Sequence, residues 1–403
     1  MLCVLRVVFY FNVLFCYCCH GYFNENYGFG IEYQWVYLNY TWPSPAHYQW
    51  AISTKTYIPQ NNAPVGIKIY RNLLFVSIPR FREGIPATLT VLDRLTASRT
   101  NPLLTPYPSW SANGISNCHG LQSIQSMEVD TRGIMWIIDG VRINNLTTCP
   151  PKLVLLDLNN DGRLVHSYVF KPEISLGQGG FLNDLVVEDV DGGYAYITDN
   201  SGIDPGIIVY SRRKNRAWKL RDGSMFAERR ASNFAVADVA FNNSVPVDGI
   251  ALSPKTINGE RILYYCALTS FTLYSILTNV IRDEDNLNSG SWRNFVTPVG
   301  TLTSQVDGIA IDSQANMYFT LLPLYGVGRW NLNDPLESTQ MIHQDPRTTI
   351  WPDGFAFDQE GVLYVISNQV FRYIDPRSTP PINSNVKFRI LGTFIGTRSY
   401  LYG

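Results

Sequence analysis

Short apolar strands, most of them led by a polar residue, recur along the chain in pairs. In the clearest copy, Val306–Asp312 (VDGIAID) is followed after a turn by Asn316–Leu322 (NMYFTLL). Two further copies are Val247–Leu252 with Ile262–Ala267 and Pro352–Phe357 with Val362–Ile366. Runs of this length and composition, bounded by Gly, Asn and Asp, are typical of β-strands. Each copy therefore predicts a β-hairpin.

Three weaker copies complete a repeat. They are Leu182–Val187 with Tyr194–Thr198, Gln125–Val129 with Ile134–Ile138, and Val65–Ile69 with Leu73–Ser77. We call the residue that leads each first strand a lead residue; in chain order these are Val65, Gln125, Asn183, Asp248, Asp307 and Asp353. They lie 60, 58, 65, 59 and 46 residues apart, enough for one four-stranded antiparallel sheet each. This spacing predicts an all-β, six-bladed β-propeller.

A ring of blades must be closed between its first and last members. Ile31–Trp42 precedes the first repeat and alternates apolar and polar residues, and Val386–Ile395 follows the last repeat. We expect these terminal strands to pair, because an open edge would leave backbone groups without partners. The polar stretch Asp283–Ser289 predicts a flexible loop.

The N-terminus has the pattern of a secretory signal. An apolar run, Val7–Cys19, follows Arg6 and is too short to span a bilayer comfortably. We assign residues 1–21 to a signal peptide, with a short uncleaved anchor as the alternative, and residues 22–403 to one propeller domain. The net charge of −1 favours neither nucleic acid nor an anionic membrane as a partner.

Three cysteines remain after the predicted signal. Cys118 and Cys149 are expected to form a disulfide in an oxidising compartment, and Cys266 to be a buried free thiol within an apolar strand. The alternative is that all three are unpaired core cysteines. Sequons at Asn39, Asn145 and Asn242 are candidate glycosylation sites and agree with secretion.

Propeller geometry converts the repeat into a predicted site. The innermost strand of every blade starts at the same rim, so the lead residues should gather at one mouth of the central channel. Three of them are Asp, and like charges in one concave site raise carboxyl pKa values or require a cation. The mouth could hold an organic amine, bind a hard metal such as calcium, or catalyse a reaction. Alternatively, Asp-Gly merely caps turns at the strand starts.

Other chemistry is sparse in the sequence. The histidines His47, His119, His166 and His343 show no metal-ligand spacing. His119, beside Cys118, is a weak candidate for a general base, with a bystander loop histidine as the alternative. The sequence has no phosphate-binding loop, nucleophile elbow or dinucleotide fingerprint, so we expect no cofactor.

Several segments resemble the insect yellow and major royal jelly protein family. They are Trp35–Pro43, Tyr57–Leu92, the Cys118 and Cys149 pair, and Trp351–Gln369 (WPDGFAFDQEGVLYVISNQ). The resemblance implies a secreted six-bladed propeller of the kind that includes cuticle pigmentation factors, dopachrome-converting enzymes and amine-binding salivary proteins. It further implies that Phe181, Trp351, Asp353 and Asn368 contact an amine. The sequence departs from the amine-binding members at Val370, where they usually have an aromatic residue.

We therefore expect a secreted protein of cuticle or eggshell pigmentation whose channel receives a catechol- or indole-type amine. Gln125, Asn183, Asp248 and Asp307 complete the predicted ligand-binding set. If the protein converts dopachrome, Asp307 or Asp353 is the candidate base. The alternatives are a non-catalytic amine-binding or structural protein, and a metal-dependent propeller lactonase that uses Gln125, Asn183, Asp248 and Asp307, with Glu128 nearby.

Overall fold

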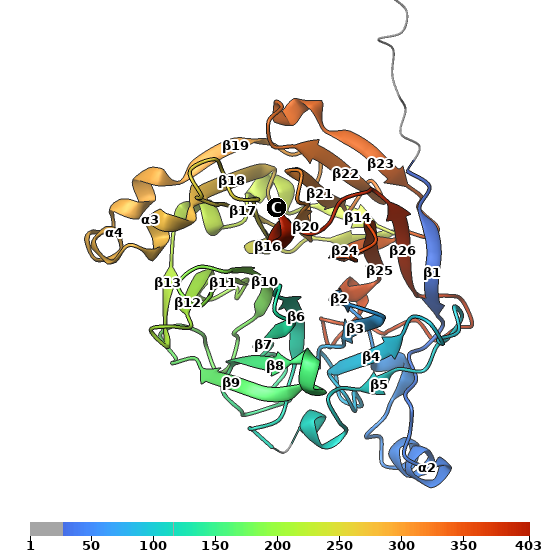
Figure 1. The fold of residues 1–403 in the computed structure, drawn as a ribbon. Coiled ribbons are helices and arrows are strands. Elements are labelled where there is room, and N and C mark those ends of the chain that lie inside the picture. Colours follow the sequence, from blue (N-terminus) through green and yellow to red (C-terminus); the bar gives the residue numbers. More distant parts are fainter. Residues whose placement is uncertain (1–26, 116) are drawn as a thin grey trace, which may run out of the picture.

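The fold is a ring of β-sheets around a central axis. The computed structural model describes residues 27–115 and 117–403, so the predicted signal peptide lies outside the described residues. Within the described part, six four-stranded sheets are arranged like the blades of a fan (Figure 1). The predicted six-bladed β-propeller is thus confirmed.

Five blades are each built from four consecutive antiparallel strands, counted from the axis outward. Blade one is β2 (Ile67–Tyr70), β3 (Leu73–Ser77), β4 (Leu89–Asp93) and β5 (Thr105–Pro106); blade two is β6 (Ile124–Val129), β7 (Ile134–Asp139), β8 (Lys152–Asp157) and β9 (Arg163–Val169). Blade three is β10 (Leu182–Glu188), β11 (Tyr194–Asp199), β12 (Gly206–Ser211) and β13 (Arg216–Leu220). Blade four is β16 (Val247–Leu252), β17 (Ile262–Ala267), β18 (Thr272–Leu277) and β19 (Thr297–Thr301); blade five is β20 (Ile309–Ile311), β21 (Asn316–Leu321), β22 (Gly326–Asn331) and β23 (Gln340–Gln344).

Blade six closes the ring with strands from both ends of the chain. It comprises β24 (Trp351–Phe357), β25 (Val362–Asn368), β26 (Phe388–Phe394) and, outermost, β1 (Gly30–Trp35). β1 is antiparallel to β26, with Trp35 opposite Phe388. The Trp35 indole is buried and donates to the carbonyl of Pro102, which ties this strand to blade one. The predicted terminal closure is confirmed, although β1 is shorter than the alternation suggested.

The innermost strands pack so closely that a side chain would not fit at some positions. A Cβ added to Gly308 would lie 2.2 Å from the carbonyl oxygen of Asp353, and one added to Gly249 would lie 2.5 Å from that of Asp307. These contacts join neighbouring blades at the axis. The glycine of the Asp-Gly step is therefore required by the approach of the next blade in blades four and five.

The C-terminal segment covers one end of the axis. The 3₁₀ helix η9 (Tyr400–Tyr402) ends the chain near the centre of the ring, beside β16 and β20 (Figure 1). The buried Tyr400 hydroxyl donates to the carbonyl of Val187 at 3.0 Å and accepts from its N–H at 2.9 Å. Thr397 donates to the buried carboxylate of Asp312. These bonds fasten the tail to blades three and five.

Several elements lie outside the repeat. They are α2 (Pro45–Ser53), α3 (Thr278–Arg282), α4 (Glu284–Ser289) and a hairpin of β14 (Phe234–Val236) and β15 (Val239–Phe241). The expected loop at Asp283–Ser289 was wrong, because Asp283 caps a helical turn by accepting from the N–H of Asn286. No described helix is both long and apolar enough to traverse a bilayer.

The cysteine prediction is confirmed. Cys118 and Cys149 form a disulfide, and Cys266 is a buried free thiol on β17. The disulfide joins the segment before β6 to the loop between β7 and β8, so it acts within blade two.

The packing at Gly308 gives a test of the blade contact. We expect Gly308→Ala to lower the free energy of unfolding by about 1–3 kcal/mol, because its methyl group must displace the backbone of Asp353. Thermal unfolding measures the change. Gly177→Ala is the matched control, since a Cβ there meets nothing within 4 Å. Equal stability of the two variants would contradict the proposed role of the glycine.

Candidate functional site

A backbone irregularity turns the lead side chains toward the axis. The pairing of the first two strands breaks between Ile124 and Met127, between Leu182 and Leu185, between Val247 and Ile250, and between Pro352 and Phe355. Each break encloses a lead residue and the residue after it. A β-bulge interrupts regular pairing and changes the direction of a side chain. In these four blades it lets the lead side chain point toward the axis instead of toward a neighbouring sheet.

Hydroxyl groups on the second strands hold these bulges and link neighbouring blades. Ser77 accepts from the N–H of Gly66 at 2.8 Å and donates to the carbonyl of Gln125 in the next blade at 2.5 Å. Thr198 likewise accepts from the N–H of Asp184 at 3.0 Å and donates to the carbonyl of Asp248 at 2.7 Å. The backbone positions of the lead residues are therefore fixed by the preceding blade.

Five of the six lead residues, all but Val65, meet at a cavity at one end of the axis, which we call the mouth. Its volume is about 390 Å³. Of the predicted ligand-binding residues, the mouth is lined by Gln125, Phe181, Asn183, Asp248, Asp307, Trp351 and Asp353. Asn368 lies behind Asp353 and donates to its carboxylate at 2.8 Å. The structure thus brings the predicted set together, with Asn368 as a supporting residue.

Each of the three mouth carboxyl groups is buried and has its own amide or indole donor. Asp248 accepts from the side-chain amides of Asn183 and Asn200, the latter at 2.8 Å. Asp307 accepts from the indole N–H of Trp351 at 2.6 Å. Among the described residues that line the mouth, none is Lys, Arg or His. No cationic side chain among these lining residues therefore neutralises the carboxyl groups, and Asp248 and Asp307 also share a hydrogen bond.

Burial and mutual repulsion raise the pKa values of these groups. Desolvation raises the pKa of Asp307 to about 6, and the Trp351 hydrogen bond limits that rise. Desolvation, followed by the charge of Asp307, raises the pKa values of Asp248 and Asp353 well above the usual range of a carboxyl group. The cluster therefore pairs Asp307 with two carboxyl groups whose burial favours the protonated form, which is the arrangement needed for paired base and acid roles.

Gln125 contributes an acceptor without a partner. Its side chain is 7% exposed, and its Oε1 atom has no hydrogen-bond partner within the described residues. Gln125 lines the mouth beside the carboxyl groups. A buried acceptor left unpaired costs about 1–3 kcal/mol, so this oxygen is suited to receive a donor from a ligand.

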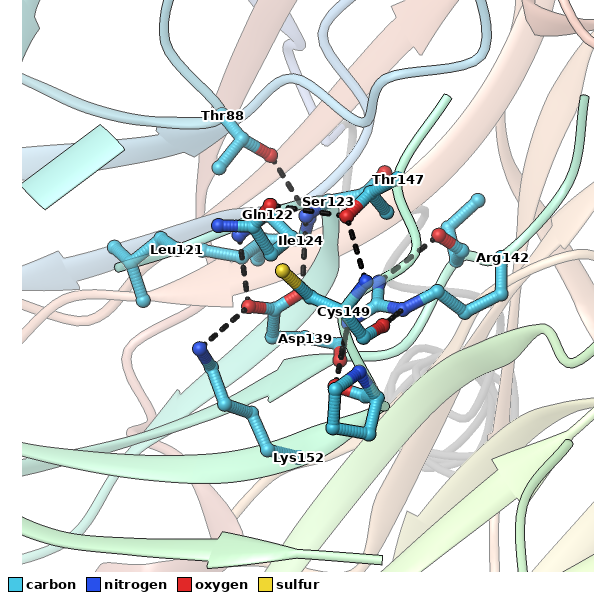
Figure 2. A network of polar contacts seen from close by, with 12 residues as sticks. Thr88, Leu121, Gln122, Ser123, Ile124, Asp139, Arg142, Thr147, Cys149 and Lys152 are labelled. Carbon is cyan, nitrogen blue, oxygen red and sulfur yellow. Dashed lines mark hydrogen bonds and ion pairs between the residues drawn. The ribbon is translucent and has the colours of Figure 1, made fainter. Parts of the chain in front are cut away.

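A polar network around Asp139 holds the residues that lead into β6, the strand that carries Gln125 (Figure 2). The buried Asp139 carboxylate accepts from the N–H groups of Gln122 at 2.8 Å and Ser123 at 2.9 Å, and from Arg142 at 3.0 Å. Arg142 also donates to the carbonyl of Cys149 at 2.7 Å. The network therefore anchors the start of β6 to the disulfide-bonded loop.

The β14–β15 hairpin supplies an aromatic edge to the mouth. Phe241 lines the cavity, and its ring centroid lies 5.8 Å from that of Trp351. Phe371 also lines the mouth, and its ring centroid lies 5.2 Å from that of Trp351. Val370 also lines the mouth, so the aromatic residue that the resemblance placed there is absent, but Phe371 follows it directly.

Other predicted residues lie elsewhere. His119 is exposed and does not line the mouth, so the structure does not bring it to the carboxyl groups. Glu128 was expected near the lead residues, but it lines a cavity at the opposite end of the axis and pairs with Lys68 at 3.1 Å. Throughout the part of the chain that is described, no group of three or more His, Cys, Asp or Glu side chains could hold a metal ion.

The candidate glycosylation sites differ in exposure. Asn145 and Asn242 are exposed, whereas Asn39 is half-buried and its side-chain oxygen accepts from the indole of Trp42. Their modification stays a prediction.

Among the mouth residues that sequence reasoning missed, three contact its carboxyl or aromatic groups. Asn200 follows the end of β11, and its role could have been found from its place beside the rim of blade three. Phe371 lies just beyond Asn368, and Phe241 belongs to a hairpin outside the repeat. The repeat gave no signal for Phe241.

Comparison with known proteins assigns the family. Residues 122–396 match the family described as "Major royal jelly protein". The chain belongs to this family. It is 30% identical over 359 residues to "Protein yellow" of Drosophila erecta, an alignment that covers 84% of this chain and 64% of that relative. It is also 30% identical over 360 residues to "Dopaminechrome tautomerase" of Drosophila melanogaster, covering 84% of this chain and 77% of that relative.

The chain thus spans somewhat less than two thirds of the length of yellow. Among solved structures, a luciferin-regenerating enzyme aligns with 85% of this chain and 96% of its own, at a TM-score of 0.48 and 11% identity.

The hydrogen bond from Trp351 gives a test of the carboxyl cluster. We expect Trp351→Phe to move the ionisation of Asp307 to higher pH by about one unit, because a bond that favours the carboxylate is lost. Carbon NMR of the carboxyl groups, assigned with Asp307→Asn, measures the midpoint. Trp218→Phe makes the same chemical change outside the mouth and should leave it in place. An unmoved midpoint in Trp351→Phe would refute the assignment.

Burial of Asp353 should cost stability at high pH. Its pKa is higher in the folded than in the unfolded chain. The free energy of unfolding therefore falls as the pH rises above the pKa that Asp353 has in the unfolded chain. We expect Asp353→Asn to raise the free energy of unfolding by about 1–3 kcal/mol at pH 8. The gain should vanish toward pH 4, where the wild-type carboxyl is protonated. Thermal unfolding across this range measures it, and a variant that is less stable at pH 8 would contradict the predicted burial cost.

Proposed function

We propose that this protein is a secreted, yellow-type pigmentation protein whose mouth binds a catechol- or indole-derived amine and promotes tautomerisation of the corresponding aminochrome. The observation that carries the proposal is the cluster of three buried carboxyl groups with raised pKa values and aromatic walls, among whose described lining residues none is basic. The names of its relatives, yellow and dopaminechrome tautomerase, support the pigment pathway. The disulfide supports an oxidising compartment.

The mouth suits a small aromatic amine. An ammonium group carries three donors, and the Asp307 carboxylate and the unpaired Gln125 oxygen offer acceptors for it. Trp351, Phe181 and Phe241 provide apolar faces for a ring. A volume of 390 Å³ falls within the roughly 300–1,000 Å³ typical of small-molecule sites.

Tautomerisation needs a base for a carbon-bound proton and an acid for a carbonyl oxygen. Asp307, ionised at neutral pH, is placed to take a proton from the ring carbon. Asp248 or Asp353, whose raised pKa favours the protonated form, supplies a proton to the quinone oxygen as the electron pair moves through the ring. No redox partner is required, because the ring gains at oxygen the proton it loses at carbon. For a carboxylated aminochrome, loss of the carboxylate as carbon dioxide is the competing route.

Substitution of the base tests the enzyme proposal. We expect the purified protein to accelerate the loss of dopaminechrome colour, and Asp307→Asn to lower kcat about 100-fold or more, as for the loss of a general base. Asp189→Asn, at an exposed position, is the control and should keep full activity. Absorbance of the aminochrome follows both reactions. An unchanged rate of colour loss with the wild-type protein would exclude catalysis.

A second candidate is an amine-binding protein without catalysis. The unpaired Gln125 oxygen favours it, because that oxygen needs a donor from a ligand but gives no assistance to proton transfer. Calorimetry with dopamine separates the two functions. Heat of binding without loss of aminochrome supports a binder, and neither signal supports a structural extracellular role.

A further inference from the structure

The mouth is the first of three cavities that follow one another along the axis. Below it lies an axial cavity of about 40 Å³, and below that a lower cavity of about 120 Å³ at the end covered by the C-terminal tail. Gln125, Asn183 and the three mouth carboxyl groups line both the mouth and the axial cavity. Lys68 and Asp184 line both the axial and the lower cavity.

Asp184 is the acidic group at the lower junction. It occupies the position after the lead residue of blade three, where blades four, five and six have glycine. Its carboxylate accepts from the hydroxyl of Ser126, which occupies the same position in blade two, at 2.7 Å. Asp184 therefore replaces a packing residue with a titratable group that faces the channel.

The axial cavity is suited to water and too small for an aromatic ring. A cavity needs about 10–15 Å³ to hold one water molecule, and that water needs polar partners. Carboxyl groups of Asp184, Asp248, Asp307 and Asp353 provide those partners from separate blades. At the lower end, Lys68 and Glu128 form an ion pair at 3.1 Å.

The charges around Asp184 permit it to take and release a proton near neutral pH. Desolvation raises its pKa to about 6, while Lys68 on β2 and the Ser126 hydroxyl oppose that rise and Glu128 on β6 adds to it. The charge of Asp184 in turn raises the pKa values of Asp307 and Asp353. The four carboxyl groups therefore titrate as a coupled set.

We propose that Asp184, acting through water in the axial cavity, returns the mouth carboxyl groups to their starting protonation states after each turnover. The proposal rests on the tautomerase function above. With Asp353 as the acid, one turnover leaves Asp307 protonated and Asp353 ionised, because one carboxyl took a proton from carbon and the other gave one to oxygen. Asp248 differs, since it shares a hydrogen bond with Asp307 and can exchange a proton with it directly. The next turnover requires the proton on Asp307 to reach its ionised neighbour Asp353. Asp184 accepts the proton as a carboxylate and gives it back to the neighbour, so no proton is gained or lost overall.

Loss of this step should leave the first turnover intact and slow the later ones. In Asp184→Asn, stopped-flow mixing with excess dopaminechrome should show a burst of about one product per protein, followed by a steady rate at least tenfold below that of the wild type. Asn keeps both an acceptor for Ser126 and the volume of Asp. Asp184→Glu restores the carboxyl group and should abolish the burst. Asp189→Asn, which is exposed and lines none of the three cavities, should behave as the wild type.

A linear time course in Asp184→Asn, fast or slow, would overturn the proposal while leaving the tautomerase function standing. A wild-type protein without turnover would remove both, since no reset would then be needed. Carbon NMR gives a readout independent of activity. The ionisation midpoint of Asp307 should fall in Asp184→Asn, because a negative charge is removed, and an unchanged midpoint would also overturn the proposal.

Discussion

Three carboxyl groups share a desolvated space at the mouth of this propeller, and no basic side chain among the described lining residues neutralises them. Burying charge without a counter-ion is costly, so the fold must hold these groups by other means. It does so with neutral donors, such as the Trp351 indole on Asp307 and the Asn368 amide on Asp353. Asn368 also donates to the carbonyl of Pro64, so the same amide supports the site and the junction between the last blade and the first.

The remainder of the architecture supports this arrangement. Bulges aim the lead residues at the axis, hydroxyls such as Thr198 fix them from the neighbouring blade, and the terminal strands prevent the ring from opening. The Asp139 network holds the start of β6 from within its own blade (Figure 2). Because each blade positions part of its neighbour, the mouth depends on the whole ring.

The six-bladed fold and the gathering of the lead residues at the mouth could be predicted from the sequence. A repeat marks equivalent positions, so once the innermost strands were identified the lead residues had to converge. The hairpin that carries Phe241 could not be found in this way, because its strands are three residues long and lie outside the repeat. Asp184 was missed for another reason. It occupies a position that is glycine in blades four to six. Only the three-dimensional packing shows that this glycine allows the backbone of the next blade to approach closely. The Cys118–Cys149 disulfide was predicted correctly. His119 is next to Cys118 in the sequence, but its side chain is exposed and does not reach the mouth.

At the start of an innermost strand, the lead residue and the residue after it have different roles, one in ligand chemistry and the other in backbone packing. In blade five, Gly308 meets the requirement for close packing and Asp307 supplies the chemistry. The close backbone contact involves the glycine and not the lead side chain, and within this chain the lead position carries Val65, Gln125 and Asn183 as well as aspartate. In a propeller of this type, exchange of a single lead side chain can therefore change which ligand the mouth accepts while the backbone of the blades is kept.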